Sequence, residues 1–262
     1  MARACQCLKP HLPEINFHDW IISCEKSHIL HSVCKLGNDQ NCSRQDPNRC
    51  DLCLYRLTLE LPRLPDMVFF KNKLVLQHKD GALIEFKPMD SLAVVSNGKQ
   101  PLEMASAHLE QSVEEKFKPF DWTFTSTYQG SMNKKVRVES TDQALEKFKL
   151  MQREPIVFHH DITLFEDELN DRGISKMSVR IRVMPSGFFI LLRHFLRVDR
   201  ELICLHDTRF HHQVGNDFIL KEYSHREAHC SELQSSVAFW TKPDEMQEYL
   251  PLKSKELYKL YF

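Results

Sequence analysis

The sequence predicts an α+β fold, a curved and mostly antiparallel β-sheet or sandwich with a few flanking helices. Two observations predict it. The chain is most apolar over residues 163–209, and turn-forming residues cut this stretch into strand-sized pieces. Elsewhere, short strand-like and helix-like segments follow one another without an internal repeat. We expect a single domain over residues 17–262, preceded by a flexible segment over residues 1–16.

The central stretch has the pattern of a three-stranded meander. Apolar residues alternate with polar ones over residues 177–183, as in a half-buried strand. Pro185-Ser186-Gly187 ends that run, and an aromatic, aliphatic run follows over residues 188–198. A helix with a serine cap is the alternative for this second run. A two-residue hairpin at Asp199-Arg200 then leads to a third strand over residues 201–210.

The segments before the meander are shorter. We expect a strand within residues 11–22, a helix or strand over 55–61, and a hairpin with its turn at Asp80-Gly81. A short helix should follow over residues 88–95, because a proline and an aspartate open it and Asn97-Gly98 closes it.

The remaining elements lie on either side of the meander. We expect a strand over residues 120–128, a helix over 143–153 capped by Ser140-Thr141-Asp142, and a strand over 156–164. Phe218-Ile219-Leu220 should add a strand. The tail over residues 237–262 has helical character, broken by two prolines.

Composition excludes several classes of protein. The net charge of −1 leaves no basic surplus to neutralise phosphates, so nucleic acid is not the expected partner. The N-terminus lacks the apolar region of a secretory signal, and no apolar run approaches the length of about 20 residues that spans a membrane. Seven glycines form no phosphate-binding loop. We expect a cytoplasmic protein.

Seven of the nine cysteines precede residue 54. Their odd number, without a secretion signal, predicts reduced thiols. Cys50 and Cys53 form a C-x-x-C pair, and with Cys34 and Cys42 upstream they are a weak candidate for a zinc site. Because the spacing is irregular, we expect an unliganded, exposed loop with no metal and no cofactor. A zinc-binding or thiol-dependent protein centred on these cysteines remains the alternative.

No catalytic motif is evident. Glu166-Asp167-Glu168, with Asp171, is an acidic cluster that could bind a divalent metal or act as a catalytic carboxylate pair. Adjacent side chains on a strand point to opposite faces, however, so we expect a solvated strand end or turn. The same argument applies to His159-His160 and His211-His212. Cys204 and His206 could share a face, but the sequence offers no third group to orient them. The protein is not expected to be an enzyme.

The third strand of the meander has a mixed face. A two-residue turn pairs Val198 with Glu201 and Leu192 with Asp207. This register places Leu205, Asp207, His194 and Leu196 on one face, and Cys204 and His206 on the other. A face that combines apolar residues with a carboxylate suits peptide binding. The alternative is that Leu205 is a core residue and that Asp207 ends the strand, paired with Arg209.

Several segments of the chain resemble the TIPRL family. They are residues 61–67 (LPRLPDM), 119–125 (PFDWTFT), 164–169 (LFEDEL), 178–186 (SVRIRVMPS), 207–209 (DTR) and 221–227 (KEYSHRE). The resemblance covers about residues 17–252. It departs from the family in the Cys-rich insertion at about residues 36–53, which is longer than the family's usual segment.

The resemblance implies a non-enzymatic regulator in TOR signalling, and we expect a monomer. Members of this family bind the catalytic subunits of type 2A, type 4 and type 6 protein phosphatases and restrain their activity. They grip the short C-terminal tail of the catalytic subunit in a cleft at a sheet edge. The family positions for that contact fall on Asp90, Leu145, Leu205 and Asp207.

Overall fold

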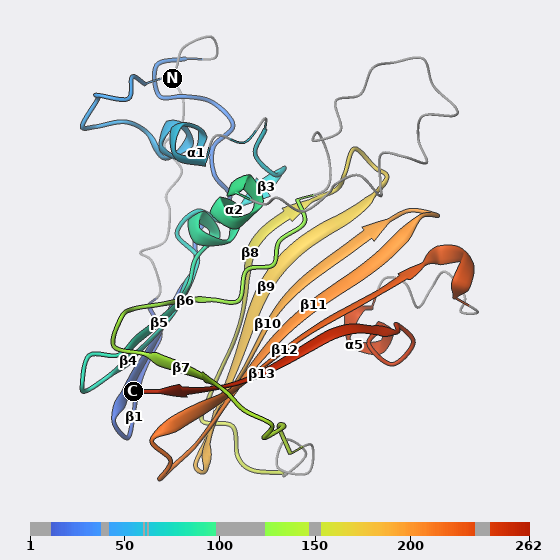
Figure 1. Cartoon of the computed structure of the whole chain (residues 1–262). Coiled ribbons are helices and arrows are strands. Elements are labelled where there is room, and N and C mark those ends of the chain that lie inside the picture. The colour runs from blue at the N-terminus through green and yellow to red at the C-terminus, as the bar shows by residue number, and fades with distance from the viewer. Residues whose placement is uncertain are drawn as a thin grey trace.

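The computed structural model describes residues 12–37, 42–59, 61, 63–97, 124–146, 153–233 and 242–262. Within these ranges, two antiparallel sheets pack on a common hydrophobic core, and short helices lie beside them (Figure 1). The predicted α+β class, with a mostly antiparallel sheet, is therefore confirmed. Most of the predicted flexible N-terminal segment lies outside the described residues.

The smaller sheet is formed near the N-terminus. Its strands, in spatial order, are β1 (Glu14–Phe17), β2 (Trp20–Glu25), β4 (Lys73–His78), β5 (Leu83–Phe86) and β6 (Ser131–Met132). The single strand predicted within residues 11–22 is two strands, because His18 adopts a positive φ of 52° and turns the chain back. The predicted hairpin at Asp80-Gly81 is confirmed, and Gly81 has the positive φ of 84° that favours glycine.

The larger sheet contains the predicted meander. Its strands, in spatial order, are β3 (Met67–Val68), β8 (Phe158–Asp167), β9 (Gly173–Met184), β10 (Gly187–Val198), β11 (Leu202–Gln213), β12 (Phe218–His229), β13 (Leu252–Tyr261) and β7 (Arg137–Ser140). From β8 to β13 each strand pairs with the next along the chain. The strand interpretation of residues 188–198 is confirmed and the helical alternative is wrong. A short 3-10 helix, η1 (Cys230–Glu232), follows β12.

The predicted register of the central hairpin is wrong by one residue. Val198 pairs with Leu202, so the loop has three residues instead of two, with Arg200 at a positive φ of 68°. Arg193, not Leu192, therefore lies opposite Asp207. His194 and Leu196 accordingly share the face of Cys204 and His206 and not that of Asp207.

Two other segments differ from the sequence prediction. The described part of the tail, residues 242–262, forms a short helix, α5 (Pro243–Met246), and then the strand β13, because β12 and β7 offer it backbone partners on both sides. Residues 124–128 do not form a strand: the side chains of Ser126 and Tyr128 hydrogen-bond with the carbonyl groups of Ser91 and Glu85, so this part of the predicted strand is wrong. Residues 120–123 lie outside the described chain.

The predicted helix over residues 143–153 is absent from the described part of this range. Residues 143–146 are not helical, and residues 147–152 lie outside the described residues. The Thr141 hydroxyl accepts a hydrogen bond from the backbone N–H of Gln143, two residues later. This local turn satisfies the hydroxyl without starting a helix.

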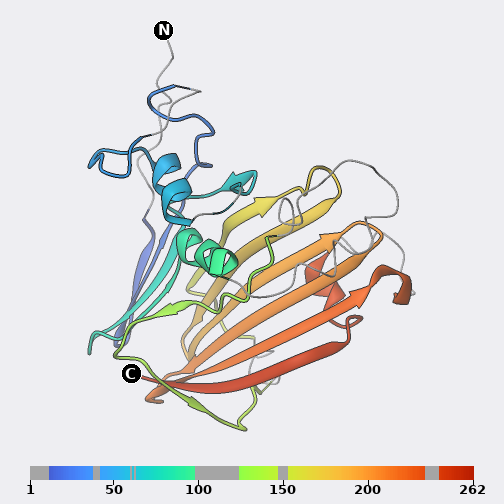
Figure 2. The same cartoon turned by 45° about the horizontal axis from the view of Figure 1, so that its top comes forward.

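Two helices lie together at one end of the sheets (Figures 1 and 2). The segment predicted as helix or strand at 55–61 belongs to α1 (Asp51–Leu59), and the helix predicted at 88–95 is α2 (Pro88–Asn97). Tyr55 and Leu59 of α1 join the main core. None of the described helices is long and apolar enough to cross a membrane.

The two sheets are joined by aromatic side chains. Phe188 of the larger sheet is fully buried and lies edge-on to Trp20 of the smaller one, with ring centroids 5.6 Å apart. The ring of Phe262, after β13, also contacts the Trp20 indole, with ring centroids 4.8 Å apart. The core therefore lies between the sheets, which leaves the opposite face of the larger sheet free for other contacts. We call that opposite face the outer face.

Candidate functional site

Asp207 lies on the outer face of β11 in a buried network of charges. Its carboxylate accepts hydrogen bonds at 2.7 and 2.8 Å from Nε and Nη2 of Arg193, and another at 2.7 Å from Arg209. The Asp207 side chain is 1% exposed. A buried carboxylate is tolerated only when it is paired, and here two guanidinium groups share it.

The same two arginines hold the segment that contains α5. Arg193 donates its remaining Nη1 to Asp244 at 2.5 Å, and Arg209 donates to Gln247 at 2.8 Å. Partial burial raises the pKa of Asp244, but the guanidinium groups of Arg193 and Arg180 outweigh that effect and lower it. The short helix is thus attached to the outer face by charged hydrogen bonds.

Apolar contacts complete the attachment. Leu205 is 1% exposed and belongs to a small cluster that is separate from the main core. The other members of this cluster are Phe195, Ile203, Ala228, Cys230, Met246 and Leu250. Leu205 is therefore a core residue, and Asp207 pairs with Arg209, as the alternative interpretation of the sequence proposed. Asp207 lies inside β11, however, and does not end it.

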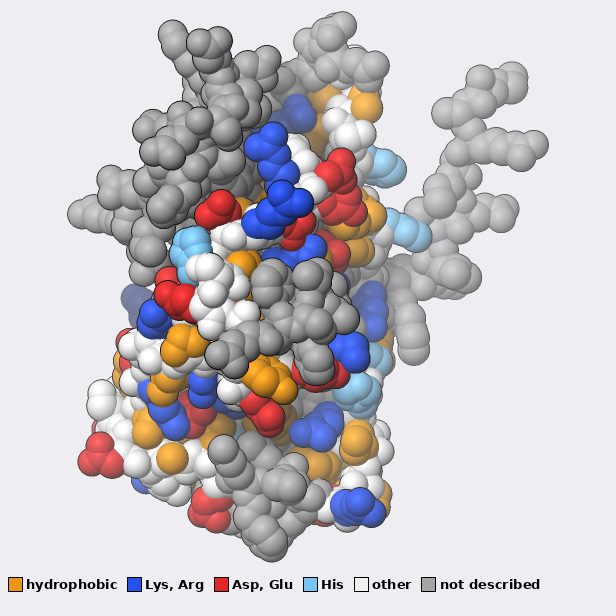
Figure 3. Space-filling model, turned by 90° about the vertical axis from the view of Figure 1, so that its right-hand side faces the viewer, with side chains coloured by type: hydrophobic (Ala, Val, Ile, Leu, Met, Phe, Trp, Pro, Cys, Tyr) orange, Lys and Arg blue, Asp and Glu red, His pale blue; other side chains and the backbone are white. Residues whose placement is uncertain are grey.

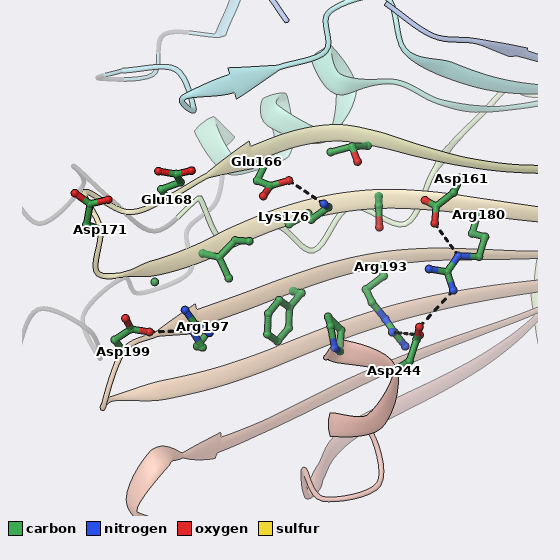
Figure 4. A pocket seen from close by; sticks show the side chains of 16 residues that line it. Asp161, Glu166, Glu168, Asp171, Lys176, Arg180, Arg193, Arg197, Asp199 and Asp244 are labelled. Atoms are coloured by element: carbon green, nitrogen blue, oxygen red, sulfur yellow. Dashed lines mark hydrogen bonds and ion pairs between the residues drawn. The ribbon is translucent and has the colours of Figure 1, made fainter. Parts of the chain in front are cut away.

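Beside α5, the outer faces of β8, β9 and β10 form an open groove of about 760 Å³ (Figure 4). Phe195 and Ile174 contribute apolar surface, and Arg193 links the groove to Asp207. The charged residues that line it are Asp161, Glu166, Glu168, Asp171, Asp199, Asp244, Lys176, Arg180, Arg193 and Arg197. In a space-filling view, acidic, basic and hydrophobic side chains are interspersed on the side of the molecule that it shows (Figure 3).

The ionic contacts in the groove organise its walls. Glu166 pairs with Lys176 at 2.8 Å, and Arg180 pairs with Asp161 at 3.0 Å (Figure 4). Both pairs are partly exposed, so each contributes little to stability and can exchange its partner for a ligand. The groove therefore offers cations and carboxylates to an extended peptide segment.

The structure does not bring the four predicted contact residues together. Leu205 and Asp207 share the outer face of β11. Asp90 lies on α2, which packs on the main core, and its carboxylate accepts a hydrogen bond from Ser131 at 2.6 Å. Leu145 is buried in the segment after β7. Arg193 was not among the predicted site residues, although an arginine within an apolar strand is a signal of a buried acidic partner.

The acidic cluster has a structural role. Asp167 is fully buried and accepts hydrogen bonds from Arg63 at 2.6 and 3.0 Å and from the backbone N–H groups of Asp66 and Leu169. These contacts close the end of β8 against the segment that leads into β3. The expectation of a solvated strand end is wrong for Asp167 and correct for the exposed Glu168.

Cys204 and His206 do meet, on the face that looks toward the core. The Cys204 thiol lies 3.2 Å from His206 Nε2 and 3.4 Å from His225 Nε2, and the Tyr223 hydroxyl lies 2.7 Å from His206 Nδ1. Burial raises the pKa of the Cys204 thiol well above its usual value. Burial, together with the neighbouring imidazoles of His194 and His225, lowers the pKa of His206 to about 2. Both groups are therefore neutral at neutral pH, and an uncharged buried thiol is a poor nucleophile.

The buried histidines predict acid sensitivity. Burial lowers the pKa of His194 to about 4, from 6.5. Below about pH 6.5, His194 and His206 bind protons in the unfolded chain but remain neutral in the folded one. Their contribution to the free energy of unfolding is therefore fully present above pH 6.5 and is lost as the pH falls toward 4. We expect a loss of about 1.4 kcal/mol per pH unit for each histidine, measured by urea unfolding at several pH values. His206→Asn should reduce this slope. Equal slopes in the wild type and in this variant would contradict the assignment.

The fold and the outer face define an α+β protein of two packed antiparallel sheets with a polar groove beside a short helix. The TIP41-like family matches residues 67–234. The chain is 38% identical over 259 residues to the TIP41-like protein of Homo sapiens, covering 94% of this chain and 88% of that one. It is 37% identical over 262 residues to the TIP41-like protein of Rattus norvegicus, covering 95% and 90%.

A more distant relative carries a functional name. The chain is 31% identical over 235 residues to the type 2A phosphatase activator TIP41 of Saccharomyces cerevisiae, covering 80% of this chain and 61% of that one. The chain belongs to the TIP41-like family, which confirms the resemblance to the TIPRL family seen in the sequence.

Proposed function

We propose that this chain binds the catalytic subunits of type 2A-family serine/threonine phosphatases and regulates them without being an enzyme. Family membership is the observation that carries this proposal. Two relatives, from Schizosaccharomyces pombe and Saccharomyces cerevisiae, are named type 2A phosphatase activators. The thiol–imidazole pair of Cys204 and His206 is buried and neutral, which also favours a binding role.

The outer-face groove is the proposed binding place for the C-terminal tail of the phosphatase subunit. Its volume and open shape suit an extended segment, and Arg193 and Arg180 supply cations for a terminal carboxylate. In this proposal Asp207 is a positioning residue: it holds the Arg193 guanidinium in a fixed orientation at the groove. Leu205 supports the same surface from below, through its contacts in the apolar cluster under α5.

The wider expectations from the sequence belong to this proposal. They are binding to type 4 and type 6 catalytic subunits, a place in TOR signalling in the cytoplasm, a monomeric state, and contact roles for Asp90 and Leu145. The resemblance implies that binding restrains phosphatase activity, whereas the two yeast relatives are named activators. An assay of phosphatase activity, with and without this chain bound, distinguishes inhibition from activation.

A substitution that fills the groove tests the proposed binding place. Ser178 lines the groove on β9, so Ser178→Trp should place an indole where the tail would lie. We expect capture of the purified catalytic subunit, and of a synthetic peptide of its C-terminal tail, to weaken roughly tenfold or more, about 1.4 kcal/mol. Binding is measured by fluorescence anisotropy with the peptide and by pull-down with the subunit.

The matched control is Ser254→Trp, a serine on the exposed strand β13. It should bind as the wild type does. Unchanged binding by Ser178→Trp would remove the groove from the proposal but leave phosphatase regulation intact. Failure of the wild-type chain to capture any type 2A-family subunit would overturn the proposed function itself.

A further inference from the structure

We propose that Cys34, Cys42, Cys50 and Cys53 bind one zinc ion in a closed, structural tetrathiolate site. The four thiols come from three places in the sequence: the segment after β2, the Cys-rich insertion, and the start of α1. The structure nevertheless brings all four sulfur atoms within 4.8 Å of one another. This site lies on α1 and the insertion, apart from the outer-face groove.

The distances between the sulfur atoms match a tetrahedron around zinc. Zinc–thiolate bonds of about 2.3 Å in tetrahedral geometry place the sulfur atoms about 3.8 Å apart. The Cys42 sulfur lies 3.7 Å from that of Cys34 and 3.8 Å from that of Cys50. The Cys34 sulfur lies 3.8 Å from that of Cys50 and 3.5 Å from that of Cys53. A disulfide would instead bring one pair to about 2.05 Å and leave the others apart.

Backbone N–H groups point at the sulfur atoms. The N–H of Cys42 donates to the Cys53 sulfur at 3.2 Å, and the N–H groups of Leu36 and Cys50 donate to the sulfurs of Cys34 and Cys42, each at 3.5 Å. Such hydrogen bonds stabilise thiolates, the form that binds a metal. Cys50 and Cys53 also flank the first turn of α1, where the helix dipole favours negative charge.

The described residues of the insertion have few apolar contacts, although polar contacts such as the Lys35–Asp46 ion pair link them. Their apolar cluster consists of the buried Cys34, Cys42 and Cys53 with the partly buried Cys50 and Leu57, and it is separate from the main core. Neighbouring apolar side chains, among them Val33, Leu36 and Leu54, are exposed. A segment that buries so little apolar surface cannot offset the entropy of ordering it, whereas a structural zinc ion can.

The donor set also determines the role of the metal. Four thiolates complete the coordination of zinc and leave no position for water or substrate, so the site is structural and not catalytic. Tyr55 of α1 is anchored in the main core and donates a hydrogen bond to the Phe70 carbonyl at 3.0 Å. The zinc therefore fastens the insertion to a helix that is already attached to the body of the protein.

Metal analysis of the purified full-length chain tests this inference. We expect one zinc per chain by inductively coupled plasma mass spectrometry, and loss of that zinc in the Cys50→Ser/Cys53→Ser double variant. Cys24→Ser and Cys230→Ser, which change buried cysteines outside the cluster, should keep it. Removal of the metal from the wild type should speed hydrogen exchange in residues 34–53 and leave the exchange of β9 and β10 unchanged.

The proposal would be overturned by the absence of stoichiometric metal in the wild type, by iron in place of zinc, or by zinc retained in the double variant. Disulfides among these cysteines, detected by mass spectrometry after thiol alkylation, would also overturn it. Should the double variant fail to fold, native mass spectrometry of the wild type before and after acidification decides the question, because a bound zinc ion leaves as the thiolates are protonated.

Discussion

Replacing Asp207 by asparagine should lower the free energy of unfolding by about 3 kcal/mol, because it leaves two buried guanidinium groups without their shared carboxylate. The loss should fall at the lower end of the range for broken buried pairs, since each arginine keeps a second acidic partner. For Arg193 this partner is Asp244, and for Arg209 it is Glu222. Urea unfolding at neutral pH measures the change.

The matched control is Asp161→Asn, which also removes one carboxylate from an arginine pair on the outer face. The Asp161 side chain is 48% exposed, and its partner Arg180 lies 3.0 Å away. Exposed pairs contribute less than about 1 kcal/mol, so this variant should unfold close to the wild type. If the two variants lost equal stability, the buried network would not be the reason.

The Asp207→Asn variant can also show whether Asp207 contributes to binding of the phosphatase tail peptide in addition to stabilising the fold. At a temperature where the variant remains folded, the proposed positioning role predicts weaker binding of the phosphatase tail peptide, because Arg193 is no longer held at the groove. Wild-type binding by the folded variant would restrict Asp207 to a structural role.

Replacing Phe188 by alanine should cost about 3–5 kcal/mol, the range for deleting a fully buried aromatic ring. Phe188 is 0% exposed and joins the two sheets: its ring lies 5.6 Å from Trp20, 6.4 Å from Phe17 and 5.0 Å from His212, between centroids. The two sheets share one core, so we expect a single cooperative transition at a lower denaturant concentration. Tryptophan fluorescence and far-ultraviolet circular dichroism during urea unfolding measure it.

The adjacent residue provides the control. Phe189 lies on the outer face, where its half-buried ring stacks beneath Arg182 at 5.6 Å. Phe189→Ala should cost about 1 kcal/mol, mostly the loss of that cation–π contact. Similar losses from the two neighbouring substitutions would contradict the assignment of the core to one face of β10.

Much of the fold could be predicted because its signals are local. The alternation over residues 177–183 and the breakers around it place β9 and β10 correctly, since a period of two needs no knowledge of the partner strand. The helix α2 and the Asp80-Gly81 turn were predictable for the same reason, because each depends on a few adjacent residues. The family resemblance, also contained in short segments, was confirmed by the comparisons.

Long-range pairing decided the rest. The predicted register of the hairpin at Asp199-Arg200 was wrong by one residue because the loop length depends on a positive φ at Arg200. An arginine side chain does not indicate such a backbone conformation. This error placed His194 and Leu196 on the wrong face of the sheet, and the pairing of Arg193 with Asp207 was therefore not predicted.

The sequence by itself thus determined the antiparallel meander, the class of fold and the family. The tertiary structure alone decided that the tail ends in β13, that Asp207 faces Arg193, and that cysteines from residue 34 to residue 53 meet around one point. The physical reason is that alternation and turn preferences act between neighbours in the chain. Register, burial of charge and convergence of ligands depend on which distant strands supply the missing backbone and side-chain partners.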